Sequence, residues 1–131
     1  MVPDTIVIHC SDSPQGRGDT AATIHRWHKE RGFDGIGYHS VILEDGTLEY
    51  GRPEYWPGAH ATRVNDHSLG VCLIGIDSFT ERQYETLATY LHNKTAEYNI
   101  SSSNIVGHYE VSTKTCPNFN VEDFKIAYNI I

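Results

Sequence analysis

Two short apolar runs constrain the fold of this chain more than any other feature. Thr5–Cys10 is β-branched and apolar, and Leu69–Ile76 is apolar almost throughout. Continuous apolar runs of this length are typical of strands that are buried on both faces. The rest of the sequence places helical patterns between such strands. This interleaving predicts an α/β protein in which helices cover both faces of a mixed sheet.

Capping and turn signals predict the other elements. Thr20–Arg31 is expected to be a helix, with Asp19 or Thr20 as its N-cap and Gly32 as its stop. The remaining expected elements are a β-hairpin of Tyr38–Leu43 and Thr47–Arg52, a helix over Thr80–Tyr98 that opens with the capping box Thr80-x-x-Gln83, a short strand over Ile105–Gly107, and a closing helix over Val121–Tyr128 capped by Asn120. We therefore expect a central mixed sheet of about five strands, flanked by helices, in a single domain spanning residues 1–131.

Length and charge exclude several classes of protein. A chain of 131 residues buries about two thirds of its unfolded surface and needs no disulfide to fold. Its net charge of −7 argues against a nucleic-acid binder, which would present a basic face to the phosphates. No apolar run of about eighteen residues predicts membrane insertion. The N-terminus lacks the basic and apolar regions of a signal peptide, so none is expected.

The three cysteines do not suggest a disulfide framework. Their odd number leaves one thiol over in any paired scheme, which suits a reducing compartment. Cys10 and Cys72 lie in apolar strand-like runs and are interpreted as small buried hydrophobic residues. Cys116 differs because it precedes Pro117 in a polar loop, where burial does not explain a thiol.

Two histidines and this third cysteine predict a metal site. His9 stands at the end of the first strand, His108 follows the short strand Ile105–Gly107, and Cys116 lies in the loop beyond. A framework of strands and loops can bring these two imidazoles and the thiolate to one point, as in an open zinc site. Three protein ligands leave one coordination position for water, which distinguishes a catalytic zinc from a structural one. The pattern therefore indicates metal-assisted hydrolysis.

The other histidines are each open to a structural interpretation. His39 is expected to be packed if its neighbour Tyr38 faces a cleft, because adjacent strand residues point to opposite faces. His60 and His67 flank a loop that either lines a substrate groove or is held by their hydrogen bonds. Glu110 is a candidate base, or an acceptor that supports a ligand. The remaining three lie in predicted helices and are interpreted as solvated or partly packed: His25, His28 and His92.

An ordered set of motifs carries a family resemblance. The motifs are Val7-Ile8-His9-Cys10-Ser11, Ile24-x-x-Trp27-His28-Lys29-x-x-Gly32, Gly37-Tyr38-His39, Asp45-Gly46-Thr47, Gly51-Arg52, Gly58-x-His60-Ala61, Asn65-x-x-Ser68-x-Gly70-Val71-Cys72-Leu73, Gly107-His108 and Lys114-x-Cys116-Pro117. In this order, from about Ile6 to Phe124, they resemble the zinc-dependent N-acetylmuramoyl-L-alanine amidases of the short phage lysozyme type. That family is related to the peptidoglycan recognition proteins.

The resemblance implies a ligand set, a reaction and catalytic residues. His9, His108 and Cys116 would bind one Zn²⁺ per chain, and the substrate would be the amide between N-acetylmuramic acid and L-alanine in peptidoglycan. Tyr38 and Lys114 occupy the places of the family's catalytic tyrosine and lysine. An ammonium beside a ligand can stabilise an oxyanion, and a phenol can orient water or donate to the same oxygen. Without the resemblance, Lys114 would be interpreted as a solvated loop lysine and Tyr38 as a cross-strand aromatic. His60 is assigned to substrate contact.

The resemblance also suggests a biological setting. A catalytic domain without a separate wall-binding domain resembles phage endolysins, which are made in the host cytoplasm and reach the periplasmic wall with the help of a holin. A bacterial recycling amidase or a prophage amidase is the alternative origin. We expect a monomer. One lysozyme of the family inhibits an RNA polymerase through a longer N-terminal arm, and this role is not carried over because only eight residues precede His9.

Two other functions compete with the enzyme. One is a non-catalytic module that binds peptidoglycan, and the other is an intracellular zinc protein that regulates a partner. A recognition module that has lost activity is expected to lack the thiolate ligand. This chain has Cys116 together with Tyr38 and Lys114, so the sequence favours the enzyme.

Overall fold

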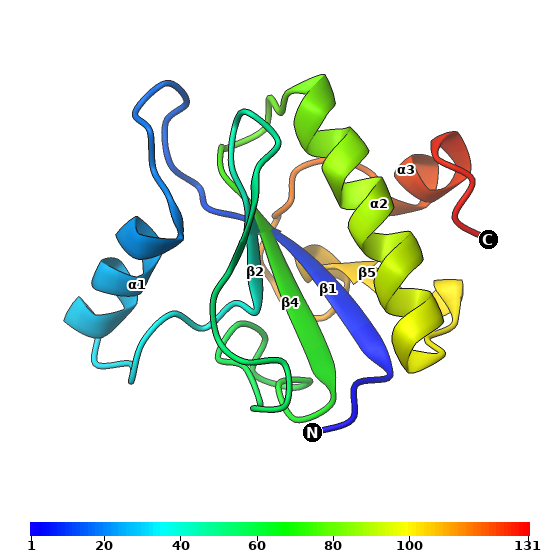
Figure 1. Cartoon of the computed structure of the whole chain (residues 1–131), viewed down its shortest axis with the longest axis horizontal. Coiled ribbons are helices and arrows are strands. Elements are labelled where there is room, and N and C mark those ends of the chain that lie inside the picture. Colours follow the sequence, from blue (N-terminus) through cyan, green and yellow to red (C-terminus); the bar gives the residue numbers. More distant parts are fainter.

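The computed structural model describes residues 1–131 and has a five-stranded sheet at its centre (Figure 1). In spatial order the strands are β3 (Leu48–Tyr50), β2 (Ser40–Ile42), β4 (Ser68–Leu73), β1 (Thr5–Cys10) and β5 (Ile105–Gly107). Neighbouring strands are parallel except β3, which pairs antiparallel with β2. The predicted mixed sheet of about five strands is confirmed.

Three helices flank the sheet, and each begins at a residue whose side chain caps it. They are α1 (Ala21–Glu30), α2 (Glu81–Tyr98) and α3 (Val121–Ala127), with N-caps Thr20, Thr80 and Asn120. The predicted capping box of α2 is present, because Thr80 Oγ1 accepts from Gln83 N–H and the Gln83 side chain accepts from Thr80 N–H. These local signals place the helix starts correctly. None of the helices combines the length and apolarity needed to cross a membrane.

Some strands are shorter than predicted. The hairpin strands β2 and β3 contain three residues each, and β4 ends at Leu73 instead of Ile76. Gly75 has a φ of +139°, so the chain leaves the extended conformation just after β4. This turn lies beside the C-terminal end of β1, where Asp12 N–H donates to Gly75 O.

The two faces of the sheet are covered unequally. Helices α2 and α3 lie on one side and α1 on the other (Figure 1). The side of α2 and α3 holds the main core of fifteen buried residues, which includes Ile6 and Ile8 of β1. The α1 side holds a cluster of five buried residues, and its strand members come from β2 and β4 alone. On that face of β1, Val7 and His9 are buried but belong to neither cluster.

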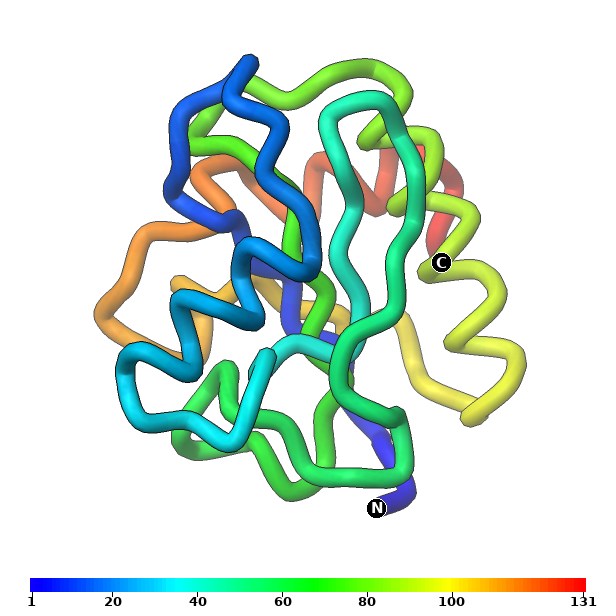
Figure 2. The backbone as a smooth tube through the Cα atoms, turned by 60° about the vertical axis from the view of Figure 1, so that its left-hand side comes forward, coloured from blue at the N-terminus to red at the C-terminus, as the bar shows by residue number.

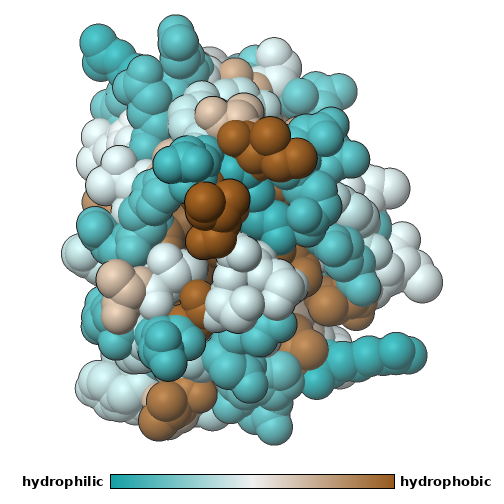
Figure 3. Space-filling model, turned by 90° about the vertical axis from the view of Figure 1, so that its right-hand side faces the viewer, coloured by the Kyte–Doolittle hydropathy of each residue, from teal (hydrophilic) through white to brown (hydrophobic).

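The outer surface over α2 and α3 differs from the interior. It is largely hydrophilic, with a few separate apolar patches (Figure 3). Ile126 of α3 and the terminal Ile131 are exposed. On the opposite side, the 51–67 loop lies close to the segment that follows α1, and Ala59 N–H donates to Gly37 O (3.1 Å) (Figure 2).

Candidate metal centre and active site

His9, His108 and Cys116 form the one cluster of potential metal ligands in the structure. One ligand atom from each residue lies within 4.8 Å of the others, and His108 Nδ1 is 3.1 Å from Cys116 Sγ. The His9 and His108 rings are 4.3 Å apart between centroids. His9 is 1% exposed, whereas the other two residues are partly buried. The cluster can therefore hold a metal ion at the border between interior and solvent.

The parallel pairing of β1 and β5 brings the two histidines together. Ile8 is in register with Gly107, so His9, near the end of β1, and His108, just after β5, lie at the same level. Tyr109 N–H donates to Cys116 O (3.0 Å), which brings the loop back to the strand end. The Glu110 carboxylate accepts from Gly107 N–H (2.7 Å) and so holds the turn that carries His108.

The donor chemistry of the cluster fits zinc. Burial lowers the pKa of His9 to about 4, so its imidazole is neutral at neutral pH. The neighbouring Cys10 and the contact with His108 Nδ1 lower the pKa of Cys116 well below the ordinary value for a thiol. Neutral imidazole and thiolate are the forms that bind metal. Ligand atoms around tetrahedral zinc lie about 3.5 Å apart, so side-chain shifts of about 1 Å would close the widest separation in the cluster.

Cys10 has a second role that sequence reasoning missed. It is 4% exposed, in agreement with its interpretation as a buried residue. The neighbouring Cys116, followed by burial, raises the pKa of Cys10, so Cys10 remains a thiol beside the cluster. No pattern in the sequence indicated this contact, because it joins the end of β1 to a loop 106 positions later. Cys72 is fully buried, as predicted.

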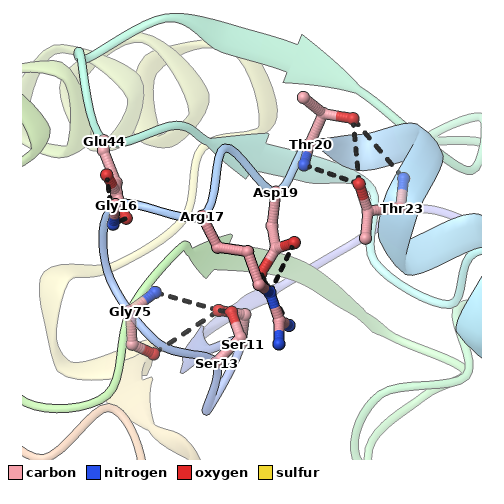
Figure 4. A network of polar contacts seen from close by, with 9 residues as sticks. All are labelled: Ser11, Ser13, Gly16, Arg17, Asp19, Thr20, Thr23, Glu44 and Gly75. Atoms are coloured by element: carbon pink, nitrogen blue, oxygen red, sulfur yellow. Dashed lines mark hydrogen bonds and ion pairs between the residues drawn. The ribbon is translucent and has the colours of Figure 1, made fainter.

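Polar contacts hold the loop that leaves the end of β1 (Figure 4). Ser11 Oγ accepts from Gly75 N–H (2.9 Å) and lies 2.6 Å from Ser13 Oγ. Farther along, Gly16 N–H donates to the Glu44 carboxylate (2.8 Å), and the Arg17 guanidinium pairs with Asp19 (2.9 Å). These contacts restrain the chain immediately after His9 and Cys10.

Tyr38 lies against the cluster, and α1 holds the segment that carries it. Its ring centroid is 4.9 Å from that of His9, and burial raises the pKa of its phenol well above the usual value. His28 Nδ1 accepts from Gly37 N–H (2.9 Å), and His25 Nδ1 accepts from Ile36 N–H (3.0 Å). Sequence reasoning did not find these two roles. The spacing of three residues between the histidines places them on one side of the helix and was the available signal.

His60 lies beside His9 and is 9% exposed. Its Nδ1 is 2.9 Å from His9 Nε2, and its Nε2 is 3.3 Å from Ser68 Oγ. Burial lowers the pKa of His60 to about 2, so the ring is neutral. Substrate contact by His60 stays a prediction, while the structure shows contact with a member of the cluster.

The other residues singled out above do not belong to the cluster. Lys114 is exposed on the loop that leads to Cys116. His39 is fully buried, as expected, with Nε2 2.8 Å from Trp56 O and Nδ1 accepting from Gly70 N–H. His67 is partly exposed and pairs with Asp4 (2.9 Å). His92 is also exposed, as expected.

Comparisons with known proteins agree in fold and in sequence. The model of the N-acetylmuramoyl-L-alanine amidase family matches residues 1–119, which include the whole cluster. The endolysin of Escherichia phage T7 is 38% identical over 127 residues, covering 91% of this chain and 83% of that endolysin. The solved structure of N-acetylmuramoyl-L-alanine amidase LysC from Clostridium intestinale URNW is 33% identical, with a TM-score of 0.89, and the match covers 99% of this chain and 87% of that one. Peptidoglycan-recognition protein SC2 of Drosophila melanogaster is 31% identical over 103 residues, covering 75% and 56% of the two chains.

Proposed function

Because the chain belongs to the N-acetylmuramoyl-L-alanine amidase family, we propose that it is a zinc enzyme whose single metal ion is held by His9, His108 and Cys116. It is an amidase homologous to phage endolysins, and its substrate class is peptidoglycan. The observation that carries the zinc proposal is the convergence of two imidazoles and one thiolate within 4.8 Å. This donor set is one that zinc takes in catalytic sites.

The proposed reaction is hydrolysis of the amide between N-acetylmuramic acid and L-alanine. When bound, zinc supplies Lewis acidity that activates water and polarises a carbonyl oxygen. Its three protein ligands leave one coordination position free for the reaction. The cluster contains no carboxylate, and the Glu110 carboxylate is occupied by Gly107 N–H. Glycoside hydrolysis normally uses a pair of carboxylates, so the site favours amide hydrolysis.

Tyr38 and Lys114 are proposed to stabilise charge during this hydrolysis. The raised pKa of Tyr38 keeps its phenol protonated at neutral pH, so the phenol can donate a hydrogen bond to the oxygen that becomes negative. The Lys114 side chain extends from the loop that carries Cys116, two residues before that ligand. Its ammonium would donate to the same oxygen when substrate fills the site. His60 is retained as a candidate for substrate contact.

The proposed biological role is inferred from the endolysin relatives. We propose that the protein is made in the cytoplasm of an infected host and acts as a monomer on the periplasmic wall after holin-dependent release. The T7 relative is an endolysin by name. The face over α2 and α3 is largely hydrophilic, as expected for a surface that does not associate (Figure 3).

Analysis of digested peptidoglycan tests the bond that is cut. The enzyme should release new L-alanine amino termini and leave the glycan strands intact. Activity should disappear with a chelator and return with zinc. Cys116→Ala should lose both zinc and activity, whereas Cys72→Ala, which removes a buried thiol outside the cluster, should keep its zinc.

Two results would contradict this function. New reducing sugar ends without alanine amines would show a glycosidase. Full lytic activity of Cys116→Ala would show that the cluster is not the metal centre.

A further inference from the structure

A chain of hydrogen bonds leads from the backbone of the 51–67 loop to His9. Ser68 Oγ donates to Val64 O (2.7 Å) and lies 3.3 Å from His60 Nε2. On the other side of the ring, His60 Nδ1 lies 2.9 Å from His9 Nε2. All three side chains are buried. These contacts connect a metal-ligand candidate to a carbonyl oxygen through two other side chains.

The direction of these bonds determines where the protons lie. The Ser68 hydroxyl gives its hydrogen to Val64 O, so its oxygen is left to accept from His60 Nε2–H. In a neutral imidazole with a hydrogen on Nε2, Nδ1 is an acceptor. His60 Nδ1 therefore accepts from His9 Nε2–H, and His9 Nδ1 carries a lone pair. That lone pair is the one available to the cluster.

The surrounding backbone holds the His60 ring in its position. Asn65 Oδ1 accepts from both His60 N–H and Ala61 N–H (2.9 and 2.8 Å). A Cβ on Gly70 would lie 2.6 Å from His60 Cγ, and a Cβ on Gly58 would lie 2.4 Å from His60 Cδ2. Both glycines therefore make room for this ring. The arrangement holds the His60 ring against the His9 ring. Substrate contact alone would not require this restraint.

We propose that His60 is a positioning residue that fixes the tautomer and the ring orientation of His9, so that His9 Nδ1 faces the metal. This inference rests on the proposed zinc function of the cluster. Groups that orient a metal-bound histidine in this way typically contribute ~10- to 100-fold to metal affinity. In the same way, the hydrogen bonds of Ser68 with His60 and with Val64 O fix the tautomer and orientation of the His60 ring.

Two substitutions of His60 distinguish the effect of its hydrogen bond to His9 from the effect of the volume of its ring. In His60→Asn, the side-chain oxygen can take the place of Nδ1 and accept from His9. In His60→Leu, no acceptor remains. The matched control is His67→Leu, which removes a partly exposed histidine at the other end of the same loop segment. Zinc affinity is measured by competition with a chromogenic chelator, and kcat and KM are measured on the same preparations.

We expect His60→Leu to bind zinc ~10- to 100-fold more weakly, with His60→Asn closer to the wild type and His67→Leu unchanged. Zinc affinity equal to wild type in His60→Leu would overturn the proposal. A raised KM in that same variant would then assign His60 to substrate contact. Failure of the wild type to bind zinc at the cluster would instead refute the proposed function.

The metal-free protein provides a test that does not depend on the His60 variants. Nitrogen-15 NMR of the histidine rings distinguishes a protonated Nε2 from a protonated Nδ1. We expect His9 to carry its hydrogen on Nε2, and Ser68→Ala to reduce that preference. The opposite tautomer of His9 in the wild type would overturn the proposal, even if every His60 variant folds poorly.

Discussion

His9 takes part in two contacts of the site. Its Nε2 lies 2.9 Å from His60 Nδ1, and its ring contributes one ligand atom to the cluster with His108 and Cys116. Its 1% exposure and its lowered pKa keep the ring neutral, which is the state that a metal requires. At this scale the catalytic proposal depends on two side chains that are not ligands, Tyr38 and Lys114.

Substitution of these two residues should separate chemistry from metal binding. Tyr38→Phe and Lys114→Gln each remove a donor to the developing negative charge, so kcat should fall by ~10²-fold or more. Zinc content and KM should change little. Steady-state kinetics and metal analysis on each variant provide the measurement.

Exposed residues of the same type provide the controls. Tyr50→Phe and Lys29→Gln alter residues outside the cluster and should retain full activity. Loss of zinc in Tyr38→Phe or Lys114→Gln would show that the residue supports the metal site and not the transition state.

At the scale of elements, α1 supports the site through backbone contacts. His25 and His28 accept from the N–H groups of Ile36 and Gly37, immediately before Tyr38. The helix thus positions a catalytic candidate without contributing a ligand. Burial, followed by the charges of Arg31 and Arg52, lowers the pKa of His28 to about 4.

This lowered pKa predicts a loss of stability in acid. The unfolded value is 6.5, so between about pH 6.5 and 4 the unfolded chain binds a proton that the folded protein does not. The contribution of His28 is complete above the unfolded pKa and is lost as the pH falls toward 4. The expected contribution is on the order of 3 kcal/mol. Urea unfolding of the metal-free protein at several pH values measures it.

His28→Asn is the matched variant, because its side-chain oxygen can accept from Gly37 N–H without titrating. Its free energy of unfolding should fall less steeply between pH 6.5 and 4 than that of the wild type. Parallel curves for the two proteins would contradict the assignment to His28, since the other buried histidines are present in both.

At the scale of the whole molecule, the core and the metal cluster are separate. None of the fifteen residues of the main core belongs to the cluster. Burial of that core is the dominant favourable contribution to folding. The fold should therefore persist when the metal is removed.

Metal-free protein is expected to unfold cooperatively and to retain its far-UV circular dichroism. Added zinc should raise Tm, because a ligand that binds only the folded state stabilises it by mass action. Cys116→Ala should show little of this rise. A metal-free protein without a cooperative transition would show that folding depends on zinc.

The sequence by itself indicated the order and type of the elements and the three residues of the candidate metal cluster. Local signals suffice for a helix start such as Thr80 with Gln83, and continuous apolar runs suffice for β1 and β4. Ordered motifs likewise indicated His9, His108 and Cys116 before any distance was known. They did so because the residue types that bind zinc are few.

The tertiary structure alone decided how these residues are supported. His60 contacts His9 across 51 positions, and Cys10 meets Cys116 across 106. Such contacts depend on strand register and on space left by residues such as Gly70, neither of which a local pattern encodes. The short hairpin strands and the early end of β4 also depend on neighbouring segments. Local propensity thus places the elements, while long-range packing determines which side chains meet.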